Sequence, residues 1–549
     1  MRAAHLCVLA LLCATGGVEA TTALEPVSFP PTTEMEPAVR AQLEDVKRRV
    51  GQAPTATSFG ACGQTFLVYD LVEPAAACLR NAARLDPREP RWPYYLGRIA
   101  VARGDLAAAA EAFERVRALA PSAPAPMLRL AETALARGDT ANARAAYTSA
   151  SHIPEAAAAA AYGLGLVALQ EGDAAAAVTQ LRAALDLAPQ AGAVRHALAT
   201  ALRRQGRVEE AAQMMPAVPG EPPPIPDPWS AEIGPLDRGG RGHLSRGTEL
   251  LAAGRIAEAE AELRQAVEAQ PENAAAWQNL AAARERRGDV AGARAAYERA
   301  LELSPDAAVA LGNLGALLLG QGERARGIAL LERALAAAPD ALQVQYNLAV
   351  ALLEGGEGGR ALPLLDAVLR RRPEDVEARY YRGVALLDAG RAAEAAVALR
   401  QVADLAPKEA APRLAEARAL LAAGDEATAR RRLEAARADL PGDEVIALEL
   451  IRVLACASDP SARDGQQSWT LAGQLLARGA NAQREAAAAM ALAELGRFSE
   501  ASEHQRRAIE LAGGRGEEVT ALRLHLASYE AGKPLRQPWR TAKAPPGSG

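Results

Sequence analysis

Apolar residues recur along most of the chain at the spacing of one helix face. In residues 274–307 (AAAWQNLAAARERRGDVAGARAAYERALELSPDA), Trp277 and Leu280 lie three positions apart, so both fall on one stripe of an α-helix. Gly288 can end this helix in the left-handed region, and Pro305 cannot continue the helix that follows. The stretch therefore predicts two helices joined by a tight turn.

The same hairpin recurs along the sequence. A shift of 34 residues brings Leu311 and Leu314 into the two large apolar slots and Gly322 into the glycine slot. The acidic residue after the glycine is expected to cap the second helix of its unit; such residues are Asp105, Asp139, Asp173 and Asp289. Each hairpin leaves an apolar face that only a neighbouring hairpin can cover, so the units should stack.

This pattern resembles the tetratricopeptide repeat (TPR) family, whose unit carries a large residue, a Leu-Gly or Leu-Ala pair, a central Gly and a final Pro. The resemblance implies an all-α fold, a right-handed superhelical solenoid of TPR helical hairpins in two arrays. It also implies that the first helix of each hairpin lines a concave groove that binds proteins or peptides.

The expected division of the chain follows from where the repeat starts and stops. It comprises a signal peptide at 1–20, a partly disordered N-terminal extension at 21–55, a first array of four to five repeats at 56–215, a Pro-rich linker at 216–239, a second array of about eight repeats at 240–513 that diverges near 444–480, a capping helix at 514–533 and a disordered tail at 534–549. We expect residues 21–40 to lack fixed structure, because they are Pro-rich or polar.

The linker has two interpretations. Pro222, Pro223 and Pro224 predict an extended, polyproline-like segment. It either separates the arrays as a semi-rigid spacer about which they hinge, or docks through Ile225 and Trp229 on the solenoid or on a partner.

The first twenty residues have the pattern of an export signal. Arg2 precedes the apolar run at 6–14, and Val18 and Ala20 supply the small residues of a cleavage site. Neither Cys7 nor Cys13 lies in a lipoprotein motif, and no later apolar run is long enough to cross a membrane. We expect a periplasmic or secreted protein.

Two of the remaining cysteines, Cys62 and Cys78, fall on the two helices of one predicted hairpin. They can form a disulfide in an oxidising compartment, or they can be two small buried hydrophobic residues. The sequence leaves both open.

Composition and motifs indicate a binding protein. The net charge of −5 supplies no basic field for nucleic acid. There is no phosphate-binding loop, no nucleophile elbow and no metal-ligand spacing, and the glycines at 355–359 fall at a repeat turn. We expect no enzyme activity, no cofactor and no metal.

Candidate binding residues fall at groove slots of the repeat. Asn279, Asn313 and Asn347 lie 34 residues apart at slot 6, where the resemblance implies that an amide grips the backbone of an extended peptide, as in O-GlcNAc transferase. The alternative is that Asn-Leu is common in the repeat. Further candidates are Tyr94, Tyr95, Arg98, Tyr346, Tyr380 and Tyr381. For Tyr95 and its neighbour Trp92, packing between helices is the alternative.

The pattern as a whole predicts an exported scaffold that binds peptide segments of other proteins in its groove. The alternative is a non-catalytic accessory subunit of an exported enzyme or redox complex. A scaffold should bind several proteins, and a subunit should bind one.

Overall fold

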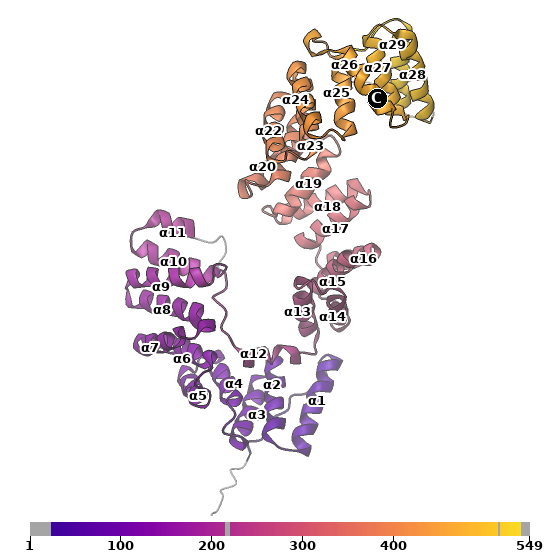
Figure 1. Ribbon diagram of the computed structural model, residues 1–549. Helices are drawn as coiled ribbons and strands as arrows, with labels where there is room; N and C mark the ends of the chain where they lie inside the picture. The colour runs from indigo at the N-terminus through magenta and orange to yellow at the C-terminus, as the bar shows by residue number, and fades with distance from the viewer. Residues whose placement is uncertain (1–23, 215–219, 514–516, 538, 540–549) are drawn as a thin grey trace, which may run out of the picture. The chain divides into compact units, whose positions relative to one another are not determined.

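The computed structural model describes residues 24–214, 220–513, 517–537 and 539, so the expected signal peptide lies outside the described residues. Within those ranges the chain is all-helical, without a β-strand, and consecutive helices pair as hairpins (Figure 1). These are the stacked helical hairpins that the periodicity predicts, in the all-α fold that the resemblance to tetratricopeptide repeats implies.

The helices up to the middle of the chain are α1 (Pro37–Gln52), α2 (Ala56–Val68), α3 (Val72–Leu85), α4 (Arg91–Ala102), α5 (Leu106–Leu119), α6 (Pro124–Ala136), α7 (Thr140–Ser151), η1 (Pro154–Ala156), α8 (Ala157–Glu171), α9 (Ala174–Leu187), α10 (Gly192–Arg204), α11 (Val208–Met214), α12 (Pro228–Ala231), η2 (Gly234–Leu236), α13 (Gly240–Ala252), α14 (Ile256–Ala269) and α15 (Ala274–Arg287).

Those that follow are α16 (Val290–Leu303), α17 (Ala308–Gly320), α18 (Arg324–Ala337), α19 (Leu342–Leu353), α20 (Gly358–Arg371), α21 (Val376–Asp388), α22 (Ala392–Leu405), α23 (Ala410–Ala423), α24 (Glu426–Asp439), α25 (Glu444–Cys456), η3 (Pro460–Ala462), α26 (Gly465–Leu476), α27 (Ala482–Glu494), α28 (Phe498–Leu511) and α29 (Glu517–Glu530).

The turn and cap residues occupy the positions that the repeat predicts. Glycines with positive φ recur every 34 residues within each array: Gly104, Gly138, Gly172 and Gly206, then Gly254, Gly288, Gly322, Gly356, Gly390 and Gly424. The predicted N-caps are confirmed, since Asp105, Asp139, Asp173 and Asp289 each accept a hydrogen bond from a backbone N–H of the following turn. At these hairpins the local signals mark where the first helix ends and the second begins.

The small slot of the first helix allows the close approach of the second helix. A Cβ atom on Gly97 would lie 2.7 Å from the Phe113 ring, and one on Gly383 would lie 2.6 Å from the Leu399 side chain. Because such distances are far inside van der Waals contact, a side chain at either glycine would force its hairpin apart.

The chain divides into two compact units, Met1–Ala283 (unit 1) and Arg284–Gly549 (unit 2). The division falls within α15 and does not coincide with the hinge expected at 216–239, which stays a prediction. Helices α13 and α14 belong to the same unit as the first repeats. Residues 236–241, which lead into α13, are hydrogen-bonded to the N-terminal part of the chain. Gln42 donates to the Leu236 carbonyl at 2.9 Å, and the N–H of Gly240 donates to Glu36 at 2.7 Å.

The N-terminal extension also differs from the expectation, because part of residues 24–40 packs against the first hairpin. The fully buried amide of Asn81 pairs with the backbone of Glu25 through both its oxygen and its nitrogen, each at 2.8 Å. Phe29 packs against Phe66 with ring centroids 5.6 Å apart. The extension thus covers the apolar end of the first hairpin, which a solenoid must shield from water.

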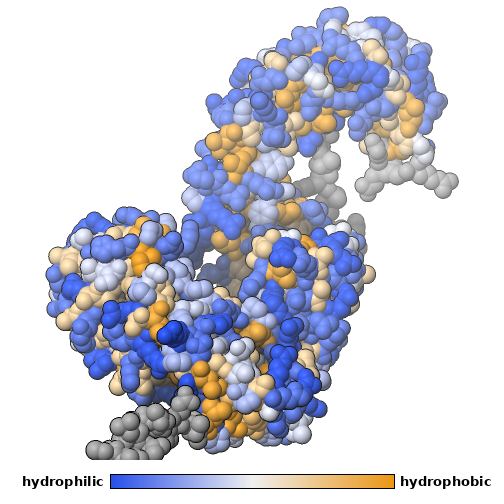
Figure 2. Space-filling view, turned by 60° about the horizontal axis from the view of Figure 1, so that its bottom comes forward, coloured by the Kyte–Doolittle hydropathy of each residue, from blue (hydrophilic) through white to orange (hydrophobic). Residues whose placement is uncertain are grey.

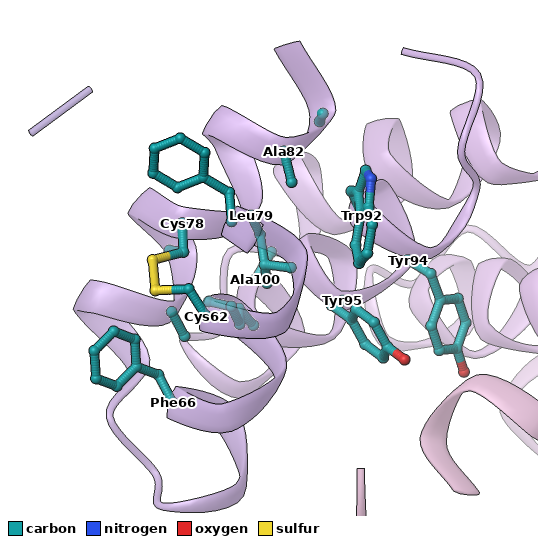
Figure 3. Packing of buried hydrophobic residues seen from close by; sticks show 14 of the residues in the cluster. Cys62, Phe66, Cys78, Leu79, Ala82, Trp92, Tyr94, Tyr95 and Ala100 are labelled. Atoms are coloured by element: carbon teal, nitrogen blue, oxygen red, sulfur yellow. A yellow bond between two sulfur atoms is a disulfide. The ribbon is translucent and has the colours of Figure 1, made fainter. Parts of the chain in front are cut away.

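A disulfide joins Cys62 on α2 to Cys78 on α3, inside the core of the first hairpin (Figure 3). Both residues are fully buried. Of the two interpretations left open by the sequence, the structure has the disulfide. Cys456 is buried and free.

Part of the tail expected to be disordered at 534–549 instead packs on unit 2. The N–H of Gln537 donates to the Cys456 carbonyl at 2.9 Å, and Arg536 pairs with Glu494 at 2.8 Å. Trp539 packs against the core around α23 to α25. These contacts span more than 40 residues of sequence, so local composition could not predict them.

Candidate functional site

The Pro-rich linker lies on the first repeats of unit 1. We call residues 221–233 the linker segment. It includes α12, which Figure 1 shows beside α2 and α4. Ile225, Trp229 and Ile233 pack against the hydrophobic core of the first hairpins. Of the two interpretations of the linker, docking on the solenoid is therefore the one observed.

Asp227 is the main polar anchor of the linker segment. Its side chain is only 7% exposed and accepts a short hydrogen bond from the Tyr94 hydroxyl. Arg129 on α6 lies 3.6 Å from the same carboxylate. Asp227 also caps α12 by accepting from the N–H of Ser230 at 2.9 Å. One carboxylate thus joins two repeats of the solenoid to the linker segment.

Two tyrosines of α4 hold the indole next to this anchor. The rings of Tyr94 and Trp229 lie 4.8 Å apart, centroid to centroid, and the Tyr95 hydroxyl donates to the Trp229 carbonyl at 2.9 Å. Figure 3 shows that the two tyrosine hydroxyls point to the same side. Burial, reinforced by Asp227, raises the pKa of Tyr94 to about 12, which keeps this phenol protonated as a donor.

Arginines complete the contact. Arg98 donates to the Ser230 hydroxyl at 2.6 Å, and Arg91 lies 3.5 Å from the carboxylate of Glu232. The predicted groove residues Tyr94, Tyr95 and Arg98 therefore do meet a segment of the same chain, which at the point of contact forms the helical turn α12. Trp92 instead packs between helices, with its ring against Gly60.

The start of the linker segment meets α10 by backbone contact. The carbonyl of Glu221 accepts from the N–H of Ala193 at 3.2 Å. A Cβ atom on Gly220 would lie 2.6 Å from the Cα of Gly192. Only a pair of glycines permits this approach.

An open cavity of about 820 Å³ remains between the linker segment and the repeats. Its walls include Tyr147, Tyr162 and Leu166 from α7 and α8, with Pro223 and Ile225 on the side of the linker segment. The linker segment therefore fills this part of unit 1 incompletely.

The aromatic candidates of unit 2 form a cluster of their own. Tyr346 on α19 packs edge-on against Tyr381 on α21 at 5.8 Å, and Tyr380 packs edge-on against Tyr381 at 5.4 Å. All three side chains are partly exposed. Burial raises the pKa of Tyr381 above its usual value, so the phenol stays neutral at ordinary pH.

The two tyrosine pairs occupy equivalent slots. Counting each repeat from its start, Tyr94 and Tyr95 fall at slots 5 and 6 of the unit at 90–123, and Tyr380 and Tyr381 fall at slots 5 and 6 of the unit that begins at Val376. Both pairs have an edge-on ring geometry, with centroids 6.0 Å and 5.4 Å apart. The chain thus carries the same pair of residues in the same two slots twice.

The three asparagines are partly exposed, and their side chains contact residues of their own or a neighbouring helix. Asn279 donates to the Thr248 hydroxyl at 2.9 Å, and Asn347 accepts from Gln343 at 2.9 Å. Burial raises the pKa of Tyr297 and the neighbouring Asn313 amide lowers it, while the Tyr297 hydroxyl donates to Glu285 at 2.9 Å. Asn279 belongs to unit 1, whereas Asn313 and Asn347 belong to unit 2.

Sequence reasoning missed several residues of this contact. Asp227, Arg129 and Ser230 carry no repeat signature, and the Gly192–Gly220 contact joins two distant points of the chain. The sequence offered one signal. Ile225 and Trp229 are large apolar residues close to Asp227 in a proline-rich stretch, and a simple spacer does not need them.

The surface seen in Figure 2 is mostly hydrophilic, with small hydrophobic patches between the polar residues. No helix of the described chain is both long and apolar enough to span a membrane. Among the same residues, no three His, Cys, Asp or Glu side chains converge in a way that could hold a metal ion.

Several solved structures are similar to this chain. YrrB, described as a TPR protein with an unusual peptide-binding site, is 25% identical, covers 34% of this chain and 96% of its own, and has a TM-score of 0.33. A TPR protein from Parabacteroides merdae is 16% identical over 52% of this chain and 98% of its own, with a TM-score of 0.31. MamA from Desulfovibrio magneticus is 21% identical over 31% and 97%, with a TM-score of 0.29. No curated protein matches the sequence.

Two family models of the tetratricopeptide repeat match the sequence. One matches residues 73–124, 128–192, 244–308, 313–367 and 351–410, and the other matches 168–229 and 386–451. Together these matches cover well over half of the chain, in both units. The chain therefore belongs to the tetratricopeptide repeat family.

Proposed function

We propose that this protein is an exported scaffold that binds extended segments of partner proteins on the concave faces of its repeats. The repeats themselves make it a scaffold for protein–protein interaction, as is typical of the family. The proposal adds the compartment, the form of the ligand and the face that binds it.

The equivalence of the two tyrosine pairs carries the proposal. In unit 1, Tyr94 and Tyr95 hold the helical turn α12 of the Pro-rich segment and its cap through one ring contact and two hydroxyl hydrogen bonds. In unit 2, Tyr380 and Tyr381 sit in the same slots and are partly exposed. Because the same two tyrosines hold a segment in unit 1, the equivalent pair in unit 2 is suited to hold a segment of another protein.

The chemistry of the exposed pair fits a peptide ligand. A tyrosine side chain offers a large apolar face and a hydroxyl, and it loses little conformational freedom when it is fixed by a ligand. Tyrosine is also enriched where proteins bind one another. Asn313 and Asn347 lie on the first helices of neighbouring hairpins. A side-chain amide both donates and accepts, so it can pair with the main chain of any sequence.

Export is supported by the disulfide between Cys62 and Cys78, because such bonds persist in oxidising compartments and are rare in the cytosol. The signal pattern at 1–20 agrees with this assignment. Intact-mass measurement of protein from its native host tests it. We expect a chain that begins at Thr21, and a mass that includes residues 1–20 would contradict export by cleavage.

A photo-crosslinking amino acid tests the binding face. We would place it at Val384, which lies at an inward slot of α21, and at Val397, which is 62% exposed on α22, the second helix of the same hairpin. We expect crosslinks to partner proteins from position 384 and few from position 397. Equal yields at the two positions would contradict a concave binding face. One partner rather than several would favour an accessory subunit over a scaffold.

A further inference from the structure

The residues that hold the linker segment define a specific kind of ligand. We propose that the linker segment is a built-in ligand of the unit 1 groove, and that a partner segment with an acidic residue two positions before an aromatic residue displaces it. This inference rests on the proposed function, in which concave faces of the repeats bind extended segments, and names the ligand chemistry for one of them.

The anchors are few and closely spaced. Asp227 is nearly buried between Tyr94 and Arg129, and Trp229 packs on Tyr94 with its carbonyl bonded to Tyr95. A hydrogen-bonded carboxylate beside an arginine is strongly favoured over an unpaired one. Any chain that offers a carboxylate and an aromatic ring in this order satisfies the same groups.

The charge around the anchors has the sign that such a ligand needs. Arg91, Arg98 and Arg129 all reach the linker segment from α4 and α6. Glu89 pairs with Arg91 and Glu132 pairs with Arg129, each at 2.9 Å, so the two glutamates offset part of this positive charge. The excess that remains attracts an acidic segment and disfavours a basic one.

The linker segment is held weakly enough to be exchanged. Its helix α12 has four residues, which is too short to be stable alone. Pro228, Ala231 and Glu232 are exposed, and Trp229 is only partly buried. Its main advantage is its tether, which gives an effective concentration on the order of millimolar. A partner segment displaces the linker segment when its concentration and affinity together outweigh this effective concentration.

The cavity of about 820 Å³ shows where a partner gains affinity. Ile225 faces it from the linker segment, opposite Tyr147, Tyr162 and Leu166. Because the cavity is open and has room beside Ile225, a larger side chain at this position can add contacts that the linker segment lacks. The preferred partner carries a large apolar residue two positions before its acidic residue.

The first test titrates a fluorescent peptide of residues 221–233 (EPPPIPDPWSAEI) into the full-length protein. We expect weak binding to the wild type and at least about 10-fold tighter binding to the double variant Asp227→Asn/Trp229→Ala, whose own segment no longer competes. A peptide with the same two substitutions is the control and should bind neither protein. Equal affinity of the native peptide for both proteins would overturn the proposal.

Gly220→Ala provides an independent variant. It disturbs the contact with Gly192 and leaves every groove side chain unchanged, so a folding defect in the double variant does not decide the result. We expect about 3- to 10-fold tighter peptide binding than to the wild type. A peptide with Ile225→Phe should bind more tightly than the native peptide, and weaker binding would remove the cavity from the account.

Selection from a random peptide library on the Gly220→Ala protein tests the partner chemistry. We expect enrichment of sequences with Asp or Glu two positions before Trp, Tyr or Phe. Enrichment of basic or unrelated sequences would overturn the assigned ligand class, as would a wild-type dimer that exchanges linker segments. If no variant binds the peptide while position 384 still crosslinks to partners, this inference fails and the proposed function stands.

Discussion

The pair Tyr94–Tyr95 in unit 1 and the pair Tyr380–Tyr381 in unit 2 have the same residues in the same repeat slots but different surroundings. The first pair is fully buried, whereas the second is partly exposed. The difference comes from the linker segment, which covers only the first pair. A repeat slot thus fixes where a side chain points, and a distant segment decides whether it is free to bind.

The disulfide is a second difference between the units, and its removal should have the largest effect. In Cys62→Ala/Cys78→Ala we expect unit 1 to lose about 3 kcal/mol of unfolding free energy, since the bond closes a loop of 16 residues. Calorimetry would show a lower transition for unit 1 alone. Cys456→Ala, at a free buried cysteine of unit 2, is the matched control and should cost less. An unchanged unit 1 transition would contradict this role.

Alkaline pH should weaken unit 1 through Tyr94. Burial and the bond to Asp227 raise its pKa in the folded state from 10 to about 12. A raised pKa stabilises the fold below pH 10, and this stabilisation is lost as the pH rises toward 12. Two units of pKa correspond to up to about 2.7 kcal/mol. Urea unfolding in this range should show a steeper loss for the wild type than for Tyr94→Phe, and parallel curves would contradict the assignment.

The same substitution at the two pairs sharpens the comparison. Tyr94→Phe removes the donor to the nearly buried carboxylate of Asp227, so we expect a loss of about 2 kcal/mol of unfolding free energy. Tyr380→Phe, at the equivalent slot, should cost less than about 0.5 kcal/mol. Chemical denaturation of both variants checks this. Equal losses would mean that the linker segment does not distinguish the pairs.

The asparagines of unit 2 should have the smallest effect. Asn313→Ala and Asn347→Ala should each reduce partner affinity by about 0.5–1.5 kcal/mol if their amides bind peptide backbone. Stability should hardly change, because alanine is the better helix former. Titration of a partner identified by crosslinking measures the first effect, and a thermal melt measures the second. Lower stability with unchanged affinity would make both asparagines structural.

The repeats could be predicted from sequence because their signals are local. Gly288 and Asp289 set a turn and a cap through their immediate neighbours. The glycine recurs every 34 residues within each array, and the capping Asp recurs at the same spacing at Asp105, Asp139 and Asp173. The glycine slot of the first helix, as at Gly383, follows from packing within one hairpin.

Docking of the linker through Ile225 and Trp229 was one of two interpretations of the sequence, but the place where it docks could not be predicted in this way. Tyr94 and Asp227 lie 133 residues apart, and nothing in the repeat pattern relates them. The groove slot of Tyr94 followed from the repeat, but its ligand did not. Only the folded unit brings the phenol, the guanidinium of Arg129 and the carboxylate together.

Hydrogen exchange of the backbone amides at Ser230, Ala231 and Glu232 tests the central claim most directly, since this claim is that the linker segment occupies the unit 1 groove. The account predicts that these amides exchange at least about 10-fold more slowly in the intact protein than in the free peptide of residues 221–233, and that Tyr94→Phe reduces this protection. Exchange at the rate of the free peptide in the intact protein would contradict it.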